Sequence, residues 1–148
     1  KVEHTFPDLE NDPFPALHDQ THEFKIVNSY DWDDFTISRT WIYATGRPYT
    51  EPADIEEEKI FGGGRVIERV LLGTKNSARL PAYHRLDLSG SYRFQLVGSE
   101  SILGATVFNL YNRNNVWYKE FDVVEGEIFE NNILFMGMTF NLFVTLRF

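Results

Sequence analysis

The sequence lacks cysteine entirely, and basic residues are scarce in it. Without cysteine, no disulfide framework, zinc finger or thiol chemistry is available. Lys and Arg number 14 against 22 Asp and Glu, a net charge of −8, which argues against an extended phosphate-binding surface. We therefore expect no nucleic-acid partner. No apolar run approaches the roughly eighteen residues that a transmembrane helix needs, so none is predicted.

Sequence signatures of catalysis are also missing. There is no nucleophile elbow and no metalloprotease motif, and Gly62-Gly63-Gly64-Arg65 lacks the Lys-Ser/Thr of a phosphate loop. His18 and His22 would share one face of a helix and, with Asp19, resemble a metal site, but the flanking pattern favours loop and strand, which breaks that spacing. We expect a protein that is not an enzyme and holds no cofactor or metal.

Aromatic residues and a period of two are abundant instead. Aromatics make up 16% of the 148 residues. From Leu134 onward every even position is a large apolar residue, while most odd positions are polar, the pattern of a strand with one apolar face. We expect a closing strand from Met138 to Phe148. Soluble strands usually span about five or six residues, whereas this one is long enough to cross a bilayer when tilted.

Four earlier segments are predicted as strands. Thr21–Tyr30, Phe35–Thr45 and Tyr83–Phe94 place apolar and polar residues on opposite faces, whereas Ile102–Tyr111 has no clear alternation and its facing stays open. Arg39 falls on the apolar face of its strand, and the sequence does not explain why. Five strands in up-and-down order are the expected core of the fold.

The predicted connections alternate in length. Asp31–Asp34 and Gln95–Ser101 are short, and Lys119–Asn132 is long. Gly46–Ala82 is long and irregular, although Arg65–Val70 could pair locally as a short strand within it, and Lys1–Gln20 reads as a loop. Transmembrane barrels have short periplasmic turns and long outer loops. This asymmetry favours an antiparallel up-and-down transmembrane β-barrel.

The aromatics give an independent check, because anchoring girdles are expected at both membrane surfaces. Up-and-down threading places one group at the short-turn end: Tyr30, Trp32, Phe35, Tyr92, Phe94 and Phe148. It places a second group at the long-loop end: Trp41, Tyr43, Tyr83, Tyr111 and Trp117. The predicted lumen-facing residues are Arg85, Asp87, Ser89, Ser91, Arg93, Thr139, Asn141, Thr145 and Arg147. A soluble sandwich or ligand-holding barrel remains the alternative; there Leu86, Leu88, Leu142 and Val144 would face inward.

Several stretches resemble the last strands of TonB-dependent receptors, the plugged outer-membrane barrels of Gram-negative bacteria. They follow the family's order over about residues 18 to 148: His18-Asp19-Gln20-Thr21-His22, Tyr43-Ala44-Thr45-Gly46-Arg47-Pro48-Tyr49-Thr50, Leu80-Pro81-Ala82-Tyr83-His84-Arg85-Leu86-Asp87-Leu88, Val107-Phe108-Asn109-Leu110-Tyr111-Asn112 and Leu146-Arg147-Phe148. Their joint occurrence is more specific than any one of them.

The resemblance implies a barrel of about 22 strands around an N-terminal plug. Residues 1–148 would be its C-terminal fragment, the last five strands, without the plug and the earlier strands. The chain begins at Lys1 without Met or a leader, so we expect a removed leader or a piece of a longer protein. The lumen-facing residues would hydrogen-bond the plug or only line a wet wall, and both readings stay open.

The implied function is TonB-powered import, across the outer membrane of a Gram-negative bacterium, of a scarce large nutrient: a ferric siderophore, a cobalamin-like cofactor or an oligosaccharide. The implied partners are the rest of the barrel, the plug, the TonB complex, outer-membrane lipid and the barrel-insertion machinery. That machinery would read Phe140, Leu142, Val144, Leu146 and Phe148, with the C-terminus on the periplasmic side. A non-transport barrel, an adhesin or structural pore, is the alternative.

Overall fold

A computed structural model describes residues 1–6, 10–59 and 66–147. Throughout these ranges the regular structure is β and every strand pairing is antiparallel, as predicted. No helix in these ranges is long and apolar enough to span a membrane. The chain forms two compact units. The meander unit comprises His22–Ala44, Tyr83–Asn115 and Phe135–Phe148, and the hairpin unit comprises Lys1–Thr21, Thr45–Ala82 and Val116–Leu134.

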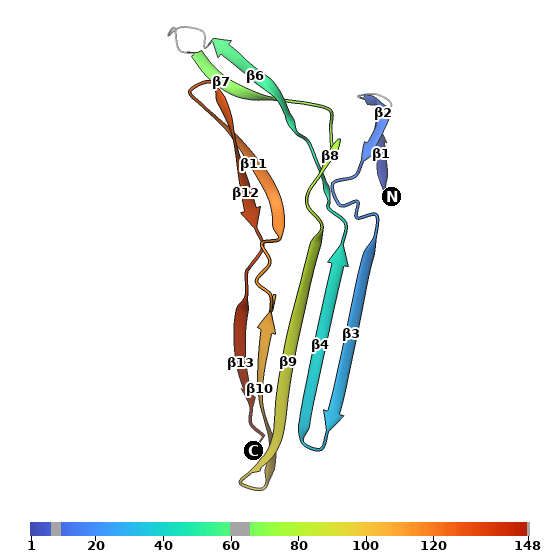
Figure 1. Cartoon of the computed structure of the whole chain (residues 1–148), viewed down its shortest axis with the longest axis vertical. Coiled ribbons are helices and arrows are strands. Elements are labelled where there is room, and N and C mark those ends of the chain that lie inside the picture. Colours follow the sequence, from blue (N-terminus) through green and yellow to red (C-terminus); the bar gives the residue numbers. More distant parts are fainter. Residues whose placement is uncertain (7–9, 60–65, 148) are drawn as a thin grey trace. The chain divides into compact units, whose positions relative to one another are not determined.

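The meander unit is one five-stranded antiparallel sheet (Figure 1). Its strands, in chain order, are β3 (Glu23–Trp32), β4 (Phe35–Ala44), β9 (Tyr83–Leu96), β10 (Ser99–Phe108) and β13 (Thr139–Thr145). Each strand pairs with the next of these in the chain, so the predicted up-and-down order is confirmed. The sheet is open, with β3 and β13 at its edges, and no closed barrel forms within the described residues.

The two short turns of the meander unit lie at the same end of the sheet, where β13 also ends (Figure 1). Asp33-Asp34 joins β3 to β4, and Val97-Gly98 joins β9 to β10. Asp33 has φ 51°, Val97 52° and Gly98 80°, left-handed values that suit two-residue hairpin turns. The predicted alternation of short and long connections is therefore present.

The bounds of all five strands differ from the prediction by up to three residues, most of all for β10 and β13. β10 runs from Ser99 to Phe108 rather than from Ile102 to Tyr111, because Val97-Gly98 turns without an Asn-Gly signal and Asn109, at φ 52°, ends the strand. The last strand, β13, has seven residues, shorter than the predicted Met138–Phe148. Phe148 lies outside the described residues.

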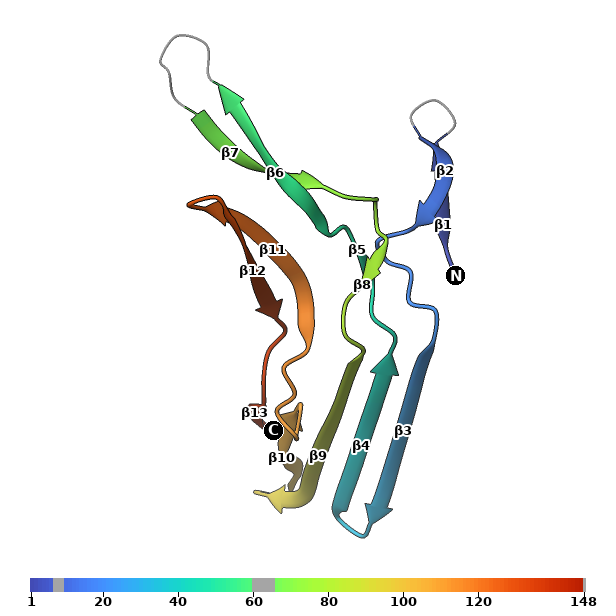
Figure 2. The ribbon, with the colours of Figure 1, turned by 45° about the horizontal axis from the view of Figure 1, so that its top comes forward.

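The hairpin unit consists of paired short strands (Figure 2). Their bounds are β1 (Glu3–Phe6), β2 (Glu10–Pro15), β5 (Pro48–Tyr49), β6 (Pro52–Lys59), β7 (Val66–Leu72), β8 (Ala78–Arg79), β11 (Val116–Val124) and β12 (Glu127–Leu134). β1 pairs with β2, β6 with β7 and β11 with β12, and β5 pairs with β8.

The prediction of loops without regular structure at Lys1–Gln20 and over most of Gly46–Ala82 was therefore wrong, and the connection Lys119–Asn132 lies within a hairpin; the local strand expected at Arg65–Val70 corresponds to β7. These hairpins are largely exposed, so their strands carry no strong apolar period for a sequence reading to detect. Backbone pairing joins their strands, and exposed cross-strand ion pairs such as that between Arg69 Nη1 and Glu58 Oε2, 2.9 Å apart, lie beside it. A left-handed turn at Glu125-Gly126, with φ 53° and 78°, closes the hairpin of β11 and β12.

A conventional hydrophobic core does not form in the described part of the chain. Only Phe14, Ala16, Ala44 and Leu80 are buried apolar residues there, and they are divided between the two units. A soluble domain of about 150 residues buries roughly two thirds of the surface that its unfolded chain exposes. The stability of the sheet must therefore have a source other than an internal core.

Candidate functional site

One face of the five-stranded sheet is apolar and exposed. The strand registers place its members side by side: Phe24, Ile26, Tyr30, Trp32, Phe35, Ile37, Trp41, Tyr43, Leu86, Leu88, Tyr92, Phe94, Leu103, Ala105, Val107, Phe140, Leu142 and Val144. We call this surface the apolar face and the opposite side the polar face. The open facing of Ile102–Tyr111 is thereby settled, because Leu103, Ala105 and Val107 lie on the apolar face.

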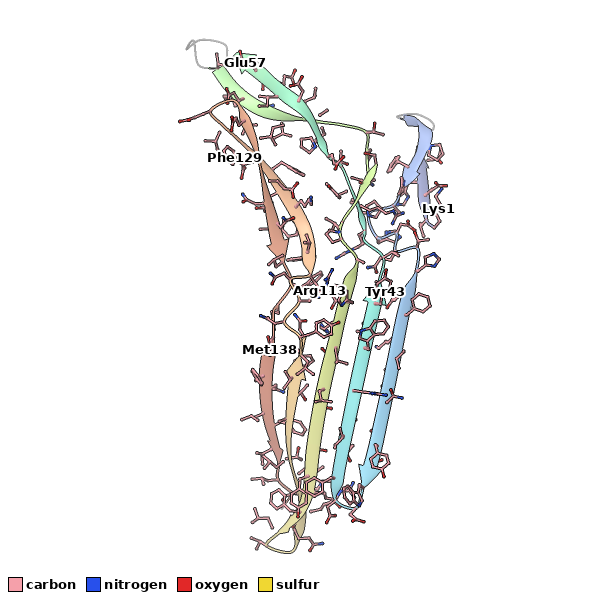
Figure 3. All side chains as sticks on the ribbon, in the orientation of Figure 1. Lys1, Tyr43, Glu57, Arg113, Phe129 and Met138 are labelled. Carbon is pink, nitrogen blue, oxygen red and sulfur yellow. The ribbon has the colours of Figure 1, made fainter. Side chains whose placement is uncertain are left out.

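The pattern of exposure is the reverse of that in a soluble sheet. On β4, Phe35 and Ile37 are 54% and 55% exposed, whereas Thr36, Ser38 and Thr40 on the opposite face are partly buried. On β13, Leu142 is 78% exposed. Figure 3 shows side chains projecting from both sides of the strands, with Tyr43 near the upper end of β4 and Met138 just before β13. On β4 and β9 the apolar face is thus the more exposed one, whereas β3 is exposed on both faces and β13 at nearly every residue.

Aromatic contacts gather at both ends of the apolar face. At the short-turn end the ring centroids of Phe35 and Tyr92 are 4.6 Å apart, and those of Tyr92 and Phe94 are 6.2 Å apart. Tyr30 and Trp32 lie at the same end on β3. At the other end Trp41 stacks on Tyr43 with ring centroids 6.2 Å apart, and the ring centroids of Phe24 and Tyr43 are 6.4 Å apart.

Two residues of the expected girdles lie elsewhere. Tyr83 is opposite Ala44 on the polar face, where its ring meets that of Phe135 edge-on at 5.5 Å. Trp117 belongs to β11 in the hairpin unit and packs edge-on against Tyr118 at 5.1 Å. β10 ends at Phe108, so Trp117 is not a continuation of that strand.

The residues expected to face a lumen occupy the polar face together. In successive rows, Arg93 and Thr145 flank Ile102, while Ser89 and Asn141 flank Thr106. Ser91 faces Gly104, Thr139 faces Phe108, and Arg85 and Asp87 continue the same side of β9. Arg147 follows β13, and its Nη1 lies 3.7 Å from Glu100 Oε1, an oxygen that is also 3.9 Å from Arg93 Nε.

Phe143 breaks the polar pattern of β13 for a packing reason. It lies on the polar face opposite Gly104 of β10. A Cβ atom on Gly104 would lie 2.2 Å from the Phe143 ring, so the ring occupies the space that glycine leaves. This pairing of a glycine with a cross-strand aromatic ring is invisible to a period-two count.

Buried asparagines organise the end of the polar face near β10. Asn109, 1% exposed, donates its backbone N–H to Asp87 Oδ1 at 3.0 Å, and its Oδ1 accepts from Arg113 N at 3.0 Å. Asn115 forms a two-way amide pair with the backbone of His84. An open depression of about 340 Å³ lies here, lined in part by Tyr83, Arg85 and Met136. The sequence predicted Asn109 to lie within the strand Ile102–Tyr111 and indicated no such hydrogen-bond network.

Arg39, unexplained from sequence, has a partner on the apolar face. The register places it directly opposite Asn28 of β3. Arg39 Nε donates to Asn28 Oδ1 at 3.0 Å, and both side chains are exposed. The only two polar residues that this face carries between its aromatic ends, among the described residues, are therefore paired with each other.

In the hairpin unit, the buried carboxylate of Asp19 forms an ion pair with the partly exposed side chain of Arg79. Arg79 Nη2 donates to Asp19 Oδ2 at 2.5 Å, and Asp19 is 1% exposed. The hydrogen bond from Arg79, with a second one from Val2 N–H, holds the pKa of Asp19 below its usual value. Asp19 is thus committed to Arg79 and Val2, and no cluster of metal-ligating side chains occurs among the described residues.

Changing Asp19 to Asn is expected to destabilise the hairpin unit in a pH-dependent way. Because the pKa of Asp19 is lower in the folded state, its stabilisation is present above the unfolded pKa of about 3.9 and is lost as pH falls through the folded pKa. Hydrogen exchange of the Leu80 amide, which donates to Arg47 O, measures the loss. Glu58→Gln, at a half-exposed ion pair, is the matched control and should change little.

A second cluster in the hairpin unit joins aromatic and charged groups. Tyr49 stacks on Phe121 with ring centroids 6.3 Å apart, and Lys119 Nζ lies 4.9 Å from the Tyr49 ring centroid. Lys119 also donates to Glu130 at 2.7 Å, which raises the pKa of the lysine. This cluster lies in the segments that sequence assigned to outer-mouth loops.

Comparison with protein-family models, with curated proteins and with solved structures finds no match for this chain. A functional interpretation therefore depends on the two faces of the sheet, on its unpaired edges and on the sequence motifs. The exposed apolar face is the feature that most constrains it.

Proposed function

We propose that this chain is the closing part of a transmembrane β-barrel of a bacterial outer membrane, the C-terminal portion of a TonB-dependent receptor. The observation that carries the membrane location is the exposed apolar face. Tyr30, Phe140 and Leu142 are 67%, 68% and 78% exposed, whereas the hydroxyl-bearing residues of β4 are partly buried. Lipid is the solvent in which such a face is stable, because exposing it to water costs about 25 cal/mol per Å².

The unpaired edges support a larger barrel. β3 and β13 each present one row of backbone groups that no other described strand pairs with. A bilayer supplies no water to satisfy such groups, so only closed sheets cross it. We propose that earlier strands of the same protein pair with both edges, completing a barrel of about 22 strands. The short turns would then face the periplasm, together with the C-terminus.

The transport role is carried by the motif resemblance. On it, the receptor imports a ferric siderophore, a cobalamin-like cofactor or an oligosaccharide, with energy from the TonB complex through the plug. The hairpins of the hairpin unit would lie at the outer mouth and contact the nutrient. The polar face, with Arg85, Asp87 and Arg93, would line the lumen or contact the plug. The protein would be a receptor without catalytic chemistry of its own.

Deletion of Phe148 tests the assembly role of the chain end. Expressed with its upstream sequence, the wild-type protein should fractionate with the outer membrane, and the deletion should lower that level several-fold, since the insertion machinery would read the closing aromatic. Arg147→Gln, next to it in sequence, is the control. Unchanged insertion of the deletion variant would remove the assembly role.

Uptake measurements separate the remaining functions. A receptor of this kind requires a plug in the upstream sequence and loses nutrient uptake when TonB is absent. A barrel that lacks a plug, or acts independently of TonB, would be an adhesin or a structural pore. If this chain alone were monomeric, soluble and cooperatively folded without detergent, the membrane proposal would be wrong and a soluble β-barrel would replace it.

A further inference from the structure

The pair formed by Arg39 and Asn28 lies halfway along β4 and the edge strand β3, on the apolar face. In sequence Arg39 is midway between Phe35 and Tyr43, which belong to the aromatic groups at the two ends of the sheet. Its cross-strand neighbour on the other side is Leu88 of β9. The pair therefore lies between the aromatic ends, where the hydrocarbon interior of a bilayer would be.

The surroundings of the pair are apolar. Arg39 and Asn28 line an open depression of about 360 Å³ together with Tyr30, Ile37 and Leu88. Among the described residues, every other position of this face between the aromatic ends is hydrophobic or glycine. A guanidinium and one amide are thus isolated in a surface that otherwise suits acyl chains.

This pair has more hydrogen-bond donors than acceptors. A guanidinium has five N–H donors and no acceptor. Arg39 uses Nε for Asn28 Oδ1, and within the described part of the chain its Nη groups have no hydrogen-bond partner. The Asn28 amide adds further donors through Nδ2. What the pair lacks is an acceptor, and one with negative charge matches it best.

Acyl chains provide no acceptor, and arginine is costly at the midplane of a lipid-facing strand. Lipid phosphates lie at the headgroup level, away from the middle of the face. A second copy docked through the same face by two-fold symmetry would set Arg39 near Arg39, and no described residue of the apolar face is Asp or Glu. A different protein is the occupant that these observations favour.

We propose that Arg39 and Asn28 form the centre of a docking site for a membrane-spanning segment of another protein, which presents a carboxylate to the Arg39 guanidinium. Tyr30, Ile37 and Leu88 supply the apolar surface around that contact. The carboxylate accepts from the two Nη groups in the fork geometry that arginine offers, and excluding lipid strengthens the pairing. This inference rests on the proposed membrane location of the chain.

A photo-reactive amino acid at Ile37, in the full-length protein in its native outer membrane, tests the proposal. The expected adduct is a peptide of another protein, and its membrane-spanning segment should contain Asp or Glu. Its yield should fall at least tenfold in Arg39→Leu and persist in Arg39→Lys. Lys25→Leu removes a cation from the polar face of β3 and is the matched control, expected to leave the yield unchanged.

An adduct with an earlier strand of the same protein, with lipid alone or with a second copy overturns the docking site. A yield that is indifferent to Arg39→Leu overturns it as well. Folding into vesicles without a partner gives a second readout: Arg39→Leu should raise the folding equilibrium constant about thirtyfold or more. A decrease would assign the pair an internal structural role and likewise overturn the proposal. A wild-type protein that is absent from the outer membrane would instead refute the membrane location itself.

Discussion

Replacing Leu142 by arginine is expected to prevent stable insertion of the protein into membranes. Leu142 is 78% exposed on the apolar face, opposite Ala105, so the new guanidinium would find no cross-strand acceptor there. Arginine near the midplane of a lipid-facing strand costs about 2–4 kcal/mol. This is a large part of the roughly 5–15 kcal/mol that holds a typical protein folded. The outer-membrane level and the folding equilibrium in vesicles both measure the effect.

The matched variant is Asn141→Arg, on the neighbouring residue. Asn141 lies on the polar face opposite Thr106, so its replacement should leave insertion close to that of the wild type. If the apolar face instead contacted water, a charge at the exposed Leu142 would change stability by no more than about 0.5 kcal/mol. Equal behaviour of the two variants would therefore contradict a lipid-facing surface.

Replacing Gly46 by alanine is expected to disrupt the hairpin unit where β5 and β8 pair. A Cβ atom on Gly46 would lie 1.6 Å from the backbone oxygen of Leu80, and a backbone atom cannot rotate away. The change would separate the segments joined by Leu80 N to Arg47 O at 2.9 Å and by Arg79 Nη1 to Gly46 O at 3.0 Å. We expect a loss of about 3 kcal/mol, at the upper end for overpacking.

Tryptic cleavage after Arg79 of the folded protein measures this loss and should accelerate at least tenfold. Gly90→Ala is the control, because nothing lies within 4 Å of a Cβ atom on Gly90. Equal cleavage of the two variants would show that the segment containing Gly46 adjusts without cost.

The period of two predicted most of the meander because four of its five strands display their own alternation. Leu86 and Leu88 on β9, or Phe140 and Leu142 on β13, indicate a two-faced strand without reference to any neighbour. The hairpins of the hairpin unit were missed for the converse reason. Exposed hairpins need no apolar period, and pairs such as Glu58 and Arg69 join residues whose pairing depends on a register that composition does not reveal.

The features of the candidate site likewise fall into those that the sequence predicted and those that only the structure revealed. Sequence alone determined the all-β antiparallel class, the order of five strands, and an apolar and a polar side for most of them. The tertiary structure decided that Phe143 packs over Gly104, that Arg39 faces Asn28, and that the apolar side is the more exposed one. Alternation is a property of one strand, whereas register and exposure arise only when residues distant in the chain lie side by side.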